Sequence, residues 1–215
     1  MLKKREEEYR EELVEVGRRL YERGLLVAGD GNISVRINEE EVLISPSGVC
    51  KGFINPLDIP KVNLKGEIIE GIKKPARDIR MHLAIYCLRP EVKAIVHAHP
   101  PVATGFAIAR RPVKITSPEV VFNLGDIVMT DYATPTTEQV PQVVKEALAG
   151  KENCGALLLA NHGSVTMGLD LMDAFYKMES LEMFLQATLV ARLLGNECEL
   201  TADQLAEIRT LAFGK

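Results

Sequence analysis

Three of the four histidines in this 215-residue chain occur in two short segments that could hold a metal ion. His97 and His99 lie two residues apart in the apolar run Ala94–His99. Side chains alternate along a strand, so both rings are expected on one face. His162 follows a second apolar run, Ala156–Ala160, which a sheet could bring alongside the first. Three imidazoles plus one open or carboxylate position form the usual ligand set of a catalytic zinc ion.

The alternative is that these histidines are ordinary residues of strands. A single strand histidine is more often packed or solvated than bound to a metal. Three of only four histidines, however, are placed at strand ends beside glycine and proline, which packing does not readily explain. The spacing therefore favours a metal site at His97, His99 and His162.

Three turns carry groups suited to binding an anion. Residues 29–32 (Gly-Asp-Gly-Asn) and 45–48 (Ser-Pro-Ser-Gly) offer backbone N–H groups, a carboxamide and hydroxyls, as phosphate-binding turns do. Residues 75–78 (Pro-Ala-Arg-Asp) open an expected helix, whose free N–H groups and Arg77 could contact the same anion. Taken singly, each segment is better explained as a common turn or a solvated helix start.

Length and composition predict one soluble domain spanning residues 1–215. The chain is 47% hydrophobic and 26% charged, and its net charge of −4 includes no basic patch that would attract nucleic acid. Four widely spaced cysteines without a Cys-x-x-Cys pair indicate neither a zinc ribbon nor a disulfide framework. No signal peptide or membrane-spanning run is apparent, so we expect a cytoplasmic protein that neither binds nor crosses membranes.

Hydrophobic periodicity predicts an α/β fold, a three-layer α/β/α sandwich around a largely antiparallel sheet. Predicted helices begin at capping residues or prolines and end at glycine or proline. Predicted strands are short runs of apolar or alternating polar and apolar residues bounded by turns. The predicted helices are Glu6–Arg23, Arg77–Leu88, Thr136–Ala149, Leu171–Leu194 and one beginning after Thr201. The predicted strands are Asn32–Ile37, Glu41–Ser45, Ile59–Leu64, Glu67–Ile69, Ala94–His99, Val113–Thr116, Asp126–Thr130, Ala156–Ala160 and Ser164–Met167.

Five motifs, in order and covering nearly the whole chain, resemble the class II aldolase/adducin family, most closely its L-fuculose-1-phosphate aldolases. Together they make the resemblance specific. The motifs are Gly31–Ser34, Ser45–Gly48, Lys74-Pro75-x-x-Asp78-x-x-x-His82, His97–His99 and Asn161–Gly163.

This resemblance implies a zinc-dependent lyase that splits a ketose 1-phosphate reversibly into dihydroxyacetone phosphate and an aldehyde. It implies that His97, His99 and His162 bind the metal and that Asp78 is the general acid/base. It further implies a homotetramer with active sites between subunits. The implied phosphate-binding positions are Gly31, Asn32, Ser47 and Gly48, to which we add Ala76 and Arg77 from the turn that opens the following helix.

One segment departs from the aldolase pattern. Aldolases of this group usually carry Ser-Ser-Glu where this chain has Ala76-Arg77-Asp78, so two hydroxyls are missing and the acid is shorter. Arg77 could hold the phosphate instead. An aspartate at this position also resembles the related L-ribulose-5-phosphate 4-epimerases, so the segment leaves the substrate open.

The expected chemistry follows from the charge that must be stabilised. Breaking a bond next to a carbonyl leaves an enediolate, which zinc or another divalent ion such as Mn²⁺ or Co²⁺ can stabilise as a Lewis acid. Asp78 is the candidate to move the proton at carbon, and it could also occupy the fourth metal position. Glu119 and Tyr132 are further candidate proton donors, although surface or packing roles explain them as well. His82, one helical turn after Asp78, is expected to support the site.

Four classes of function remain open from the sequence. The aldolase leads, and an epimerase or a decarboxylase/dehydratase using the same zinc enediolate comes second. An adducin-like scaffold without activity would have no use for the histidines. A hydrolytic zinc enzyme would not explain the phosphate-type turns.

Overall fold

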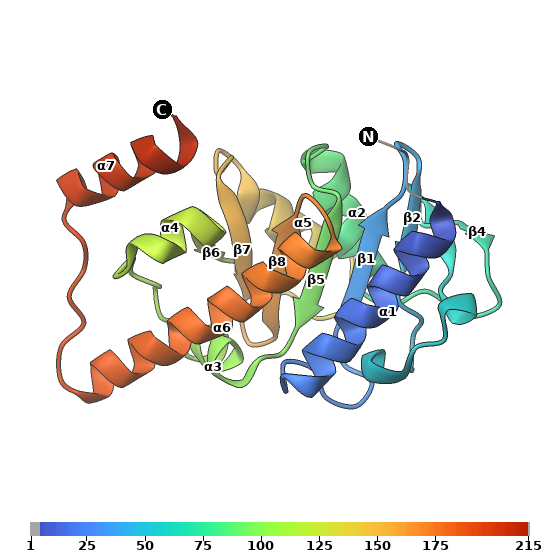
Figure 1. Cartoon of the computed structure of the whole chain (residues 1–215), viewed down its shortest axis with the longest axis horizontal. Coiled ribbons are helices and arrows are strands. Elements are labelled where there is room, and N and C mark those ends of the chain that lie inside the picture. The colour runs from blue at the N-terminus through green and yellow to red at the C-terminus, as the bar shows by residue number, and fades with distance from the viewer. Residues whose placement is uncertain (1–4, 215) are drawn as a thin grey trace.

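The computed structural model describes residues 5–214, which form an eight-stranded sheet between two layers of helices (Figure 1). The predicted α/β/α sandwich is therefore confirmed. The strand order is β4-β3-β2-β1-β5-β8-β7-β6, and every pair is antiparallel except β6 with β7. The strands are β1 (Asn32–Arg36), β2 (Glu41–Ile44), β3 (Lys61–Asn63), β4 (Ile68–Glu70), β5 (Ala94–Ala98), β6 (Asp126–Met129), β7 (Cys154–Leu159) and β8 (Gly163–Gly168).

Helices cover both faces of the sheet. One layer holds α1 (Glu6–Glu22), α3 (Pro101–Ala109), α4 (Pro118–Leu124) and α6 (Leu171–Leu193). The other layer holds α2 (Ile79–Leu88) and α5 (Gln139–Leu148). A long connection leads from α6 to α7 (Ala202–Phe213), which lies against α4 at the edge of the molecule (Figure 1). No helix within residues 5–214 is both long and apolar enough to span a bilayer.

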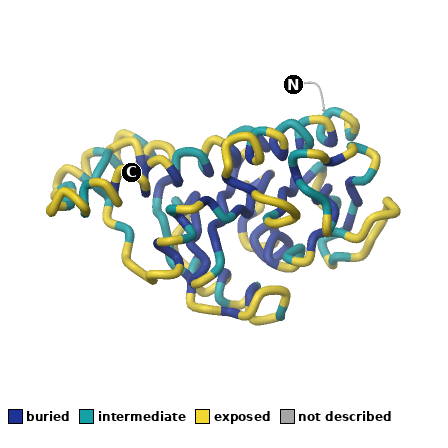
Figure 2. Tube along the Cα trace, turned by 90° about the horizontal axis from the view of Figure 1, so that it is seen from below, coloured by how far each residue is buried: buried dark blue, intermediate teal, exposed yellow. Residues whose placement is uncertain are grey.

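Strand alternation divides the apolar side chains into two cores. Figure 2 shows buried segments running through the middle of the molecule, and the central strands β1, β5, β7 and β8 are buried along their whole length. In β1, Ile33 and Val35 pack in the core under α1 and α6, whereas Ser34 points to the opposite face and contacts α2. In β5, Ala94 and Val96 share the first core and Ile95 belongs to the second. His97, two residues after Ile95, therefore projects on the α2 side.

One predicted strand is wrong, and two helices were not predicted. Val113–Thr116 forms no strand; Val113 and Ile115 are partly buried and pack against the core on the α1 and α6 side of the sheet without pairing in the sheet. The helices that were not predicted are α3 and α4. Both have a proline at their first turn, where its missing N–H costs nothing, so proline starts these helices rather than interrupting the chain.

Two predicted helices begin later than expected. Asp78 is the N-cap residue of α2, so Ala76 and Arg77 belong to the preceding turn. The last helix before β7 begins at Gln139, because Thr136 has a positive φ of 68° that no right-handed helix accommodates. Pro141 consequently lies in the first turn of α5, where proline is tolerated.

Gly17 allows α1 to lie directly against the short 3-10 helix η1 (Lys51–Phe53). A Cβ atom at this position would lie 2.3 Å from the carbonyl oxygen of Lys51. Real Cβ atoms do not approach backbone oxygens so closely, so the glycine is required for this contact. Contact with α1 thereby holds the backbone of η1, the segment that follows Gly48 in the chain.

We expect Gly17→Ala to destabilise the protein by about 1–3 kcal/mol, because η1 must move away from α1. Thermal and urea unfolding measure this loss. Gly105→Ala is the matched control, since Gly105 lies within α3 and no atom lies within 4 Å of an added Cβ. Alanine there should be neutral or stabilising by up to about 1 kcal/mol. Equal stability of the two variants would show that the close contact is unimportant.

Candidate active site

Three histidine rings meet at one end of the central strands. His97 lies in β5, His99 follows the end of β5, and His162 lies in the tight turn between β7 and β8. Pairing of β5 with β8, and of β8 with β7, brings that turn beside the end of β5. The three ring centroids are 4.8–5.0 Å apart, and one ligand atom from each ring lies within 4.8 Å of the others.

A backbone hydrogen bond fixes the form of His97. Its Nδ1 lies 2.9 Å from the carbonyl oxygen of Ser164, and since a carbonyl only accepts, Nδ1 carries the proton. The unprotonated Nε2 then points toward Nε2 of His99, 3.2 Å away. Two nitrogens bound to one tetrahedral zinc ion would be separated by about 3.3 Å. The pair is therefore already spaced for a shared ion.

Burial keeps the triad neutral, which is the form that binds a metal. Desolvation lowers the pKa of His97 well below its usual value, and the neighbouring His162 and His99 lower this pKa further. Desolvation also lowers the pKa values of His99 and His162. At neutral pH all three rings can therefore offer a lone pair, and the donor set fits a divalent cation such as Zn²⁺.

Gly163 permits the close approach between the histidine segments. A Cβ on this residue would lie 2.4 Å from Cδ2 of His99 and 2.7 Å from the carbonyl oxygen of Ala98. The glycine after His162 is thus explained by packing against the His99 ring. The Asn-His-Gly sequence therefore provides both a candidate metal ligand, His162, and the space for the neighbouring ring of His99.

Asp78 lies beside the triad, with Oδ2 3.9 Å from Nε2 of His97. The same oxygen accepts a 2.9 Å hydrogen bond from Nδ2 of Asn32. The side chain of Asp78 is 15% exposed and faces the cavity, so it can reach a bound molecule. Its position fits either a fourth metal ligand or a proton carrier next to the metal.

A buried chain of hydrogen bonds orients Asn32. Because its amide nitrogen donates to Asp78, its Oδ1 must accept from Nε2 of His82, 2.5 Å away. His82 then accepts at Nδ1 from Ser34, whose Oγ accepts in turn from the hydroxyl of Tyr86. Burial lowers the pKa of His82 to about 4, so the ring is neutral as this pattern requires. The supporting role predicted for His82 is consistent with this geometry.

A cavity of about 540 Å³ opens onto the triad. It gathers all three predicted anion-binding turns, although they come from distant parts of the sequence. His97 itself is buried beneath the cavity and only 1% exposed. The predicted residues that line it are Gly31, Asn32, Ser47, Gly48, Ala76, Arg77, Asp78, His99 and His162.

Backbone pairing decides which N–H groups of these turns can bind a ligand. The N–H of Ser47 donates to the carbonyl of Lys74, and the N–H of Ala76 donates to the carbonyl of Ser45. These bonds join two turns but use up both donors. The N–H groups of Gly48 and Arg77 have no acceptor within residues 5–214 and remain available to an anion.

The cavity is also lined by residues that were not predicted to belong to the site. Asp30 has Oδ2 4.0 Å from Nδ1 of His99, and Lys51 lies buried between the first two turns. Pro135 and Thr136 close another side. Asp30 could have been inferred from its place in the Gly29–Asn32 turn, but no motif points to Lys51.

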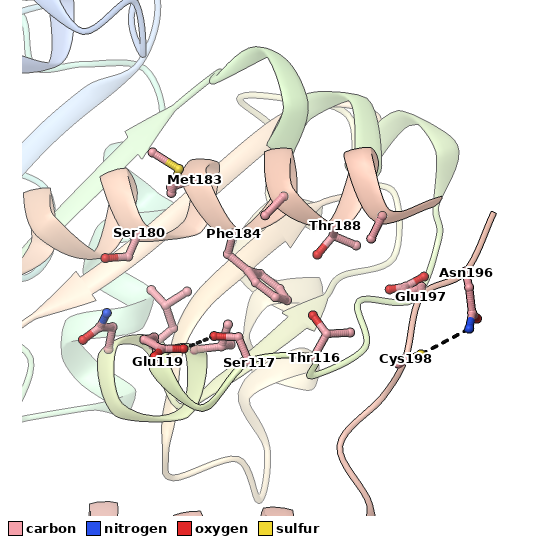
Figure 3. A pocket seen from close by; sticks show the side chains of 15 residues that line it. Thr116, Ser117, Glu119, Ser180, Met183, Phe184, Thr188, Asn196, Glu197 and Cys198 are labelled. Carbon is pink, nitrogen blue, oxygen red and sulfur yellow. Dashed lines mark hydrogen bonds between the residues drawn. The ribbon is translucent and has the colours of Figure 1, made fainter. Parts of the chain in front are cut away.

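Glu119 and Tyr132 do not line this cavity. Glu119 is exposed at the first turn of α4, where it accepts a hydrogen bond from Ser117 in a separate pocket between α4 and α6 (Figure 3). Tyr132 is 50% exposed, and the guanidinium of Arg110 lies 5.9 Å from its ring centre. Among residues 5–214, Asp78 and Asp30 are the carboxylates that line the cavity.

The family model of the class II aldolase and adducin N-terminal domain matches residues 11–189 of this chain. The chain belongs to this family. The resemblance inferred from the five motifs is therefore confirmed, and the aligned region includes every residue of the cavity.

Relatives in the family carry different activities. The chain is 31% identical to 3-oxo-tetronate 4-phosphate decarboxylase of Escherichia coli K12, covering 95% of this chain and 97% of that protein. It is 34% identical to L-fuculose phosphate aldolase of Methanococcus vannielii, covering 80% and 90%. The solved structure of YgbL from Klebsiella pneumoniae, described as a candidate aldolase/epimerase/decarboxylase, superposes with a TM-score of 0.87 at 32% identity, covering 96% and 100%.

We expect His162→Ala to lose most of the bound divalent ion, with affinity falling by more than the roughly 10–100-fold typical of indirect partners of a metal. Elemental analysis after dialysis against a weak chelator measures the ion content. Glu119→Gln is the control, because Glu119 lies outside the cavity, and it should retain one ion per chain. Full metal occupancy in His162→Ala would remove this histidine from the ligand set.

Proposed function

We propose that this protein is a divalent-metal-dependent lyase that breaks a carbon–carbon bond next to a carbonyl group in a phosphorylated sugar or sugar acid. The supporting observation is that the histidine triad, Asp78 and two free backbone N–H groups of phosphate-type turns share one cavity. A metal site without the turns would fit many hydrolases equally well. The combination is what favours a sugar-phosphate lyase.

His97, His99 and His162 would hold the metal, with Zn²⁺ the first candidate and Mn²⁺ or Co²⁺ as alternatives. When bound, such an ion stabilises negative charge that develops on the substrate oxygens as the bond breaks. Neutral imidazoles leave the ion its full double charge. The hydrogen bond from His97 to Ser164 keeps the first ligand in the required tautomer.

Asp78 would carry the proton to or from the reacting carbon. A positioned acid/base contributes roughly 10²–10⁴-fold to rate. The hydrogen bond from Asn32 holds one carboxylate oxygen, which leaves Oδ1 to face the substrate. Asn32 is in turn fixed by His82, so the orientation of the acid is determined by a buried network rather than by a mobile loop.

The phosphate would bind between the N–H groups of Gly48 and Arg77, with the guanidinium of Arg77 adding charge. Ala76 contributes only a buried methyl group to this wall, and its N–H is already used. Arg77 is exposed, so it can move to meet an anion at the mouth of the cavity. In this arrangement, the N–H and guanidinium groups of Arg77 would take the place of the two serine hydroxyls that the Ser-Ser-Glu segment provides in aldolases.

Aldol cleavage of a ketose 1-phosphate to dihydroxyacetone phosphate and an aldehyde remains the first candidate reaction. It needs a base for the hydroxyl proton of the departing aldehyde and an acid for the carbon left behind. Tyr132 and Glu119 are exposed and could supply the second group to a neighbouring subunit. We therefore propose a homotetramer whose active sites lie between subunits.

Decarboxylation of a 3-oxo sugar acid phosphate is the second candidate, and one observation favours it. Loss of CO₂ leaves a carbanion that needs a single proton, so one acid suffices. The cavity presents Asp78 for this role and holds its other carboxylate, Asp30, beside His99, while Glu119 and Tyr132 lie elsewhere. The decarboxylase relative also aligns over 95% of this chain. An epimerase on the same metal scaffold remains a further alternative.

Substrate panels separate these reactions. If the aldolase proposal holds, the metal-loaded protein should condense dihydroxyacetone phosphate with short aldehydes, and a chelator should abolish the reaction. If decarboxylation is correct, a 3-oxo acid phosphate should release CO₂ without forming an aldehyde. Conversion of a pentulose 5-phosphate to its C4 epimer would support the epimerase. Failure of all three with stoichiometric metal bound would refute the lyase proposal.

We expect Asp78→Asn to keep its metal while losing about 10²–10⁴-fold in kcat, because the amide can still accept from Asn32 but cannot carry the proton. Metal analysis and turnover are measured on the same sample. Asp203→Asn in α7 is the control, since Asp203 is exposed and outside the cavity. Unchanged turnover of Asp78→Asn would assign proton transfer to another group.

A further inference from the structure

Lys51 is a buried cation that the reaction described above does not use. Its side chain is only 2% exposed, yet it lines the active-site cavity. Its Nζ donates to the carbonyl oxygens of Gly29 (2.7 Å) and Val49 (2.9 Å), which border the two glycine-containing turns. The lysine therefore lies between the segments proposed to bind phosphate.

The hydrogen bonds of Lys51 leave part of the ammonium group unsatisfied. An ammonium has three N–H donors, and within residues 5–214 two of them have acceptors. No carboxylate of the described chain lies within 4.0 Å of Nζ. Burial without an ion pair disfavours the charged form, and desolvation accordingly lowers the pKa of Lys51.

A purely structural role does not account for the charge. Two carbonyl groups could be bridged by a neutral donor at a smaller desolvation cost. A buried positive charge becomes favourable when an anion enters the cavity and takes the remaining N–H. Neither cavity carboxylate accepts the third N–H of Lys51, because Asp78 and Asp30 lie beside the histidines.

We propose that Lys51 is the charged group that binds the substrate phosphate, and that it makes the enzyme select phosphorylated over unphosphorylated sugars. This inference rests on the proposed function for the identity of the substrate. The backbone N–H groups of Gly48 and Arg77 would bind the other phosphate oxygens. The backbone of Lys51 is held by α1, because Gly17 lets this helix lie directly against the carbonyl group of Lys51.

Calorimetric titration of the metal-loaded protein with inorganic phosphate, dihydroxyacetone phosphate and dihydroxyacetone tests this proposal. We expect Lys51→Met to weaken binding of both phosphate compounds by roughly 10–100-fold, the effect of losing a hydrogen bond to a charged group. Binding of dihydroxyacetone should stay within about twofold of the original protein. Lys65→Met, in the exposed turn between β3 and β4, is the control and should bind all three normally.

Lys51→Gln separates charge from loop structure, because its amide can still donate to Gly29 or Val49. Selective loss of phosphate binding in this variant supports the proposal. Equal loss of dihydroxyacetone binding, or no loss at all, overturns it. If neither variant folds, a crystal structure of the unmodified protein with phosphate decides: Nζ should lie within hydrogen-bond distance of a phosphate oxygen, and a separation beyond about 4 Å contradicts the assignment.

These measurements are independent of turnover. If the protein binds phosphate through Lys51 but acts on none of the lyase substrates, the reaction proposal fails and the inference about Lys51 stands. If the protein is an active lyase and Lys51→Met leaves KM for the phosphorylated substrate unchanged, the inference fails alone.

Discussion

The register of three neighbouring strands, β1, β5 and β8, determines where His97, Asn32 and the groups hydrogen-bonded to them lie. Asn32 is paired with His97 across β1 and β5, and Ala98 is paired with Ser164 across β5 and β8. The second pairing places the carbonyl of Ser164 next to Nδ1 of His97. A shift of one residue would turn His97 into the opposite core, because strand side chains alternate. Apolar residues on both faces, such as Ile95 and Val96, make that shift unfavourable.

Polar groups beneath the cavity depend on this register as well. A carboxylate can only accept hydrogen bonds, so Asp78 determines the direction of each donor from Asn32 through His82 to Ser34. Each member of the chain is satisfied, which is what allows a polar network to be buried without a large cost. The same bonds tie α2 to β1, so the helix that carries Asp78 is fixed relative to the strand that carries His97. The network thus links stability of the fold to geometry of the site.

The parts of the site that the sequence predicts are those encoded by short-range patterns. A spacing of two residues places His97 and His99 together in any strand, and the family motifs add His162 and Asp78. Lys51 is different, because its position depends on the contact between Gly17 and η1, which joins residues 34 positions apart. Val113–Thr116 was mistaken for a strand for a related reason. Val113 and Ile115 are partly buried against the core without pairing in the sheet, and local composition does not distinguish the two environments.

The cavity is built from two parts that meet at Asp78 and Asn32. The candidate metal end is formed by β5 and the turn between β7 and β8, whereas the proposed anion end is formed by the turns after α1, after β2 and before α2. Stabilising a charge next to a carbonyl is common to aldol cleavage and decarboxylation, so the metal end can serve either reaction. Differences between such reactions would then arise at the proposed anion end. Relatives named as decarboxylase and as aldolase are about equally similar to this chain, as expected if they share the metal end. On the proposed division, the Ala76-Arg77-Asp78 segment and Lys51 carry more information about the substrate than the histidines do.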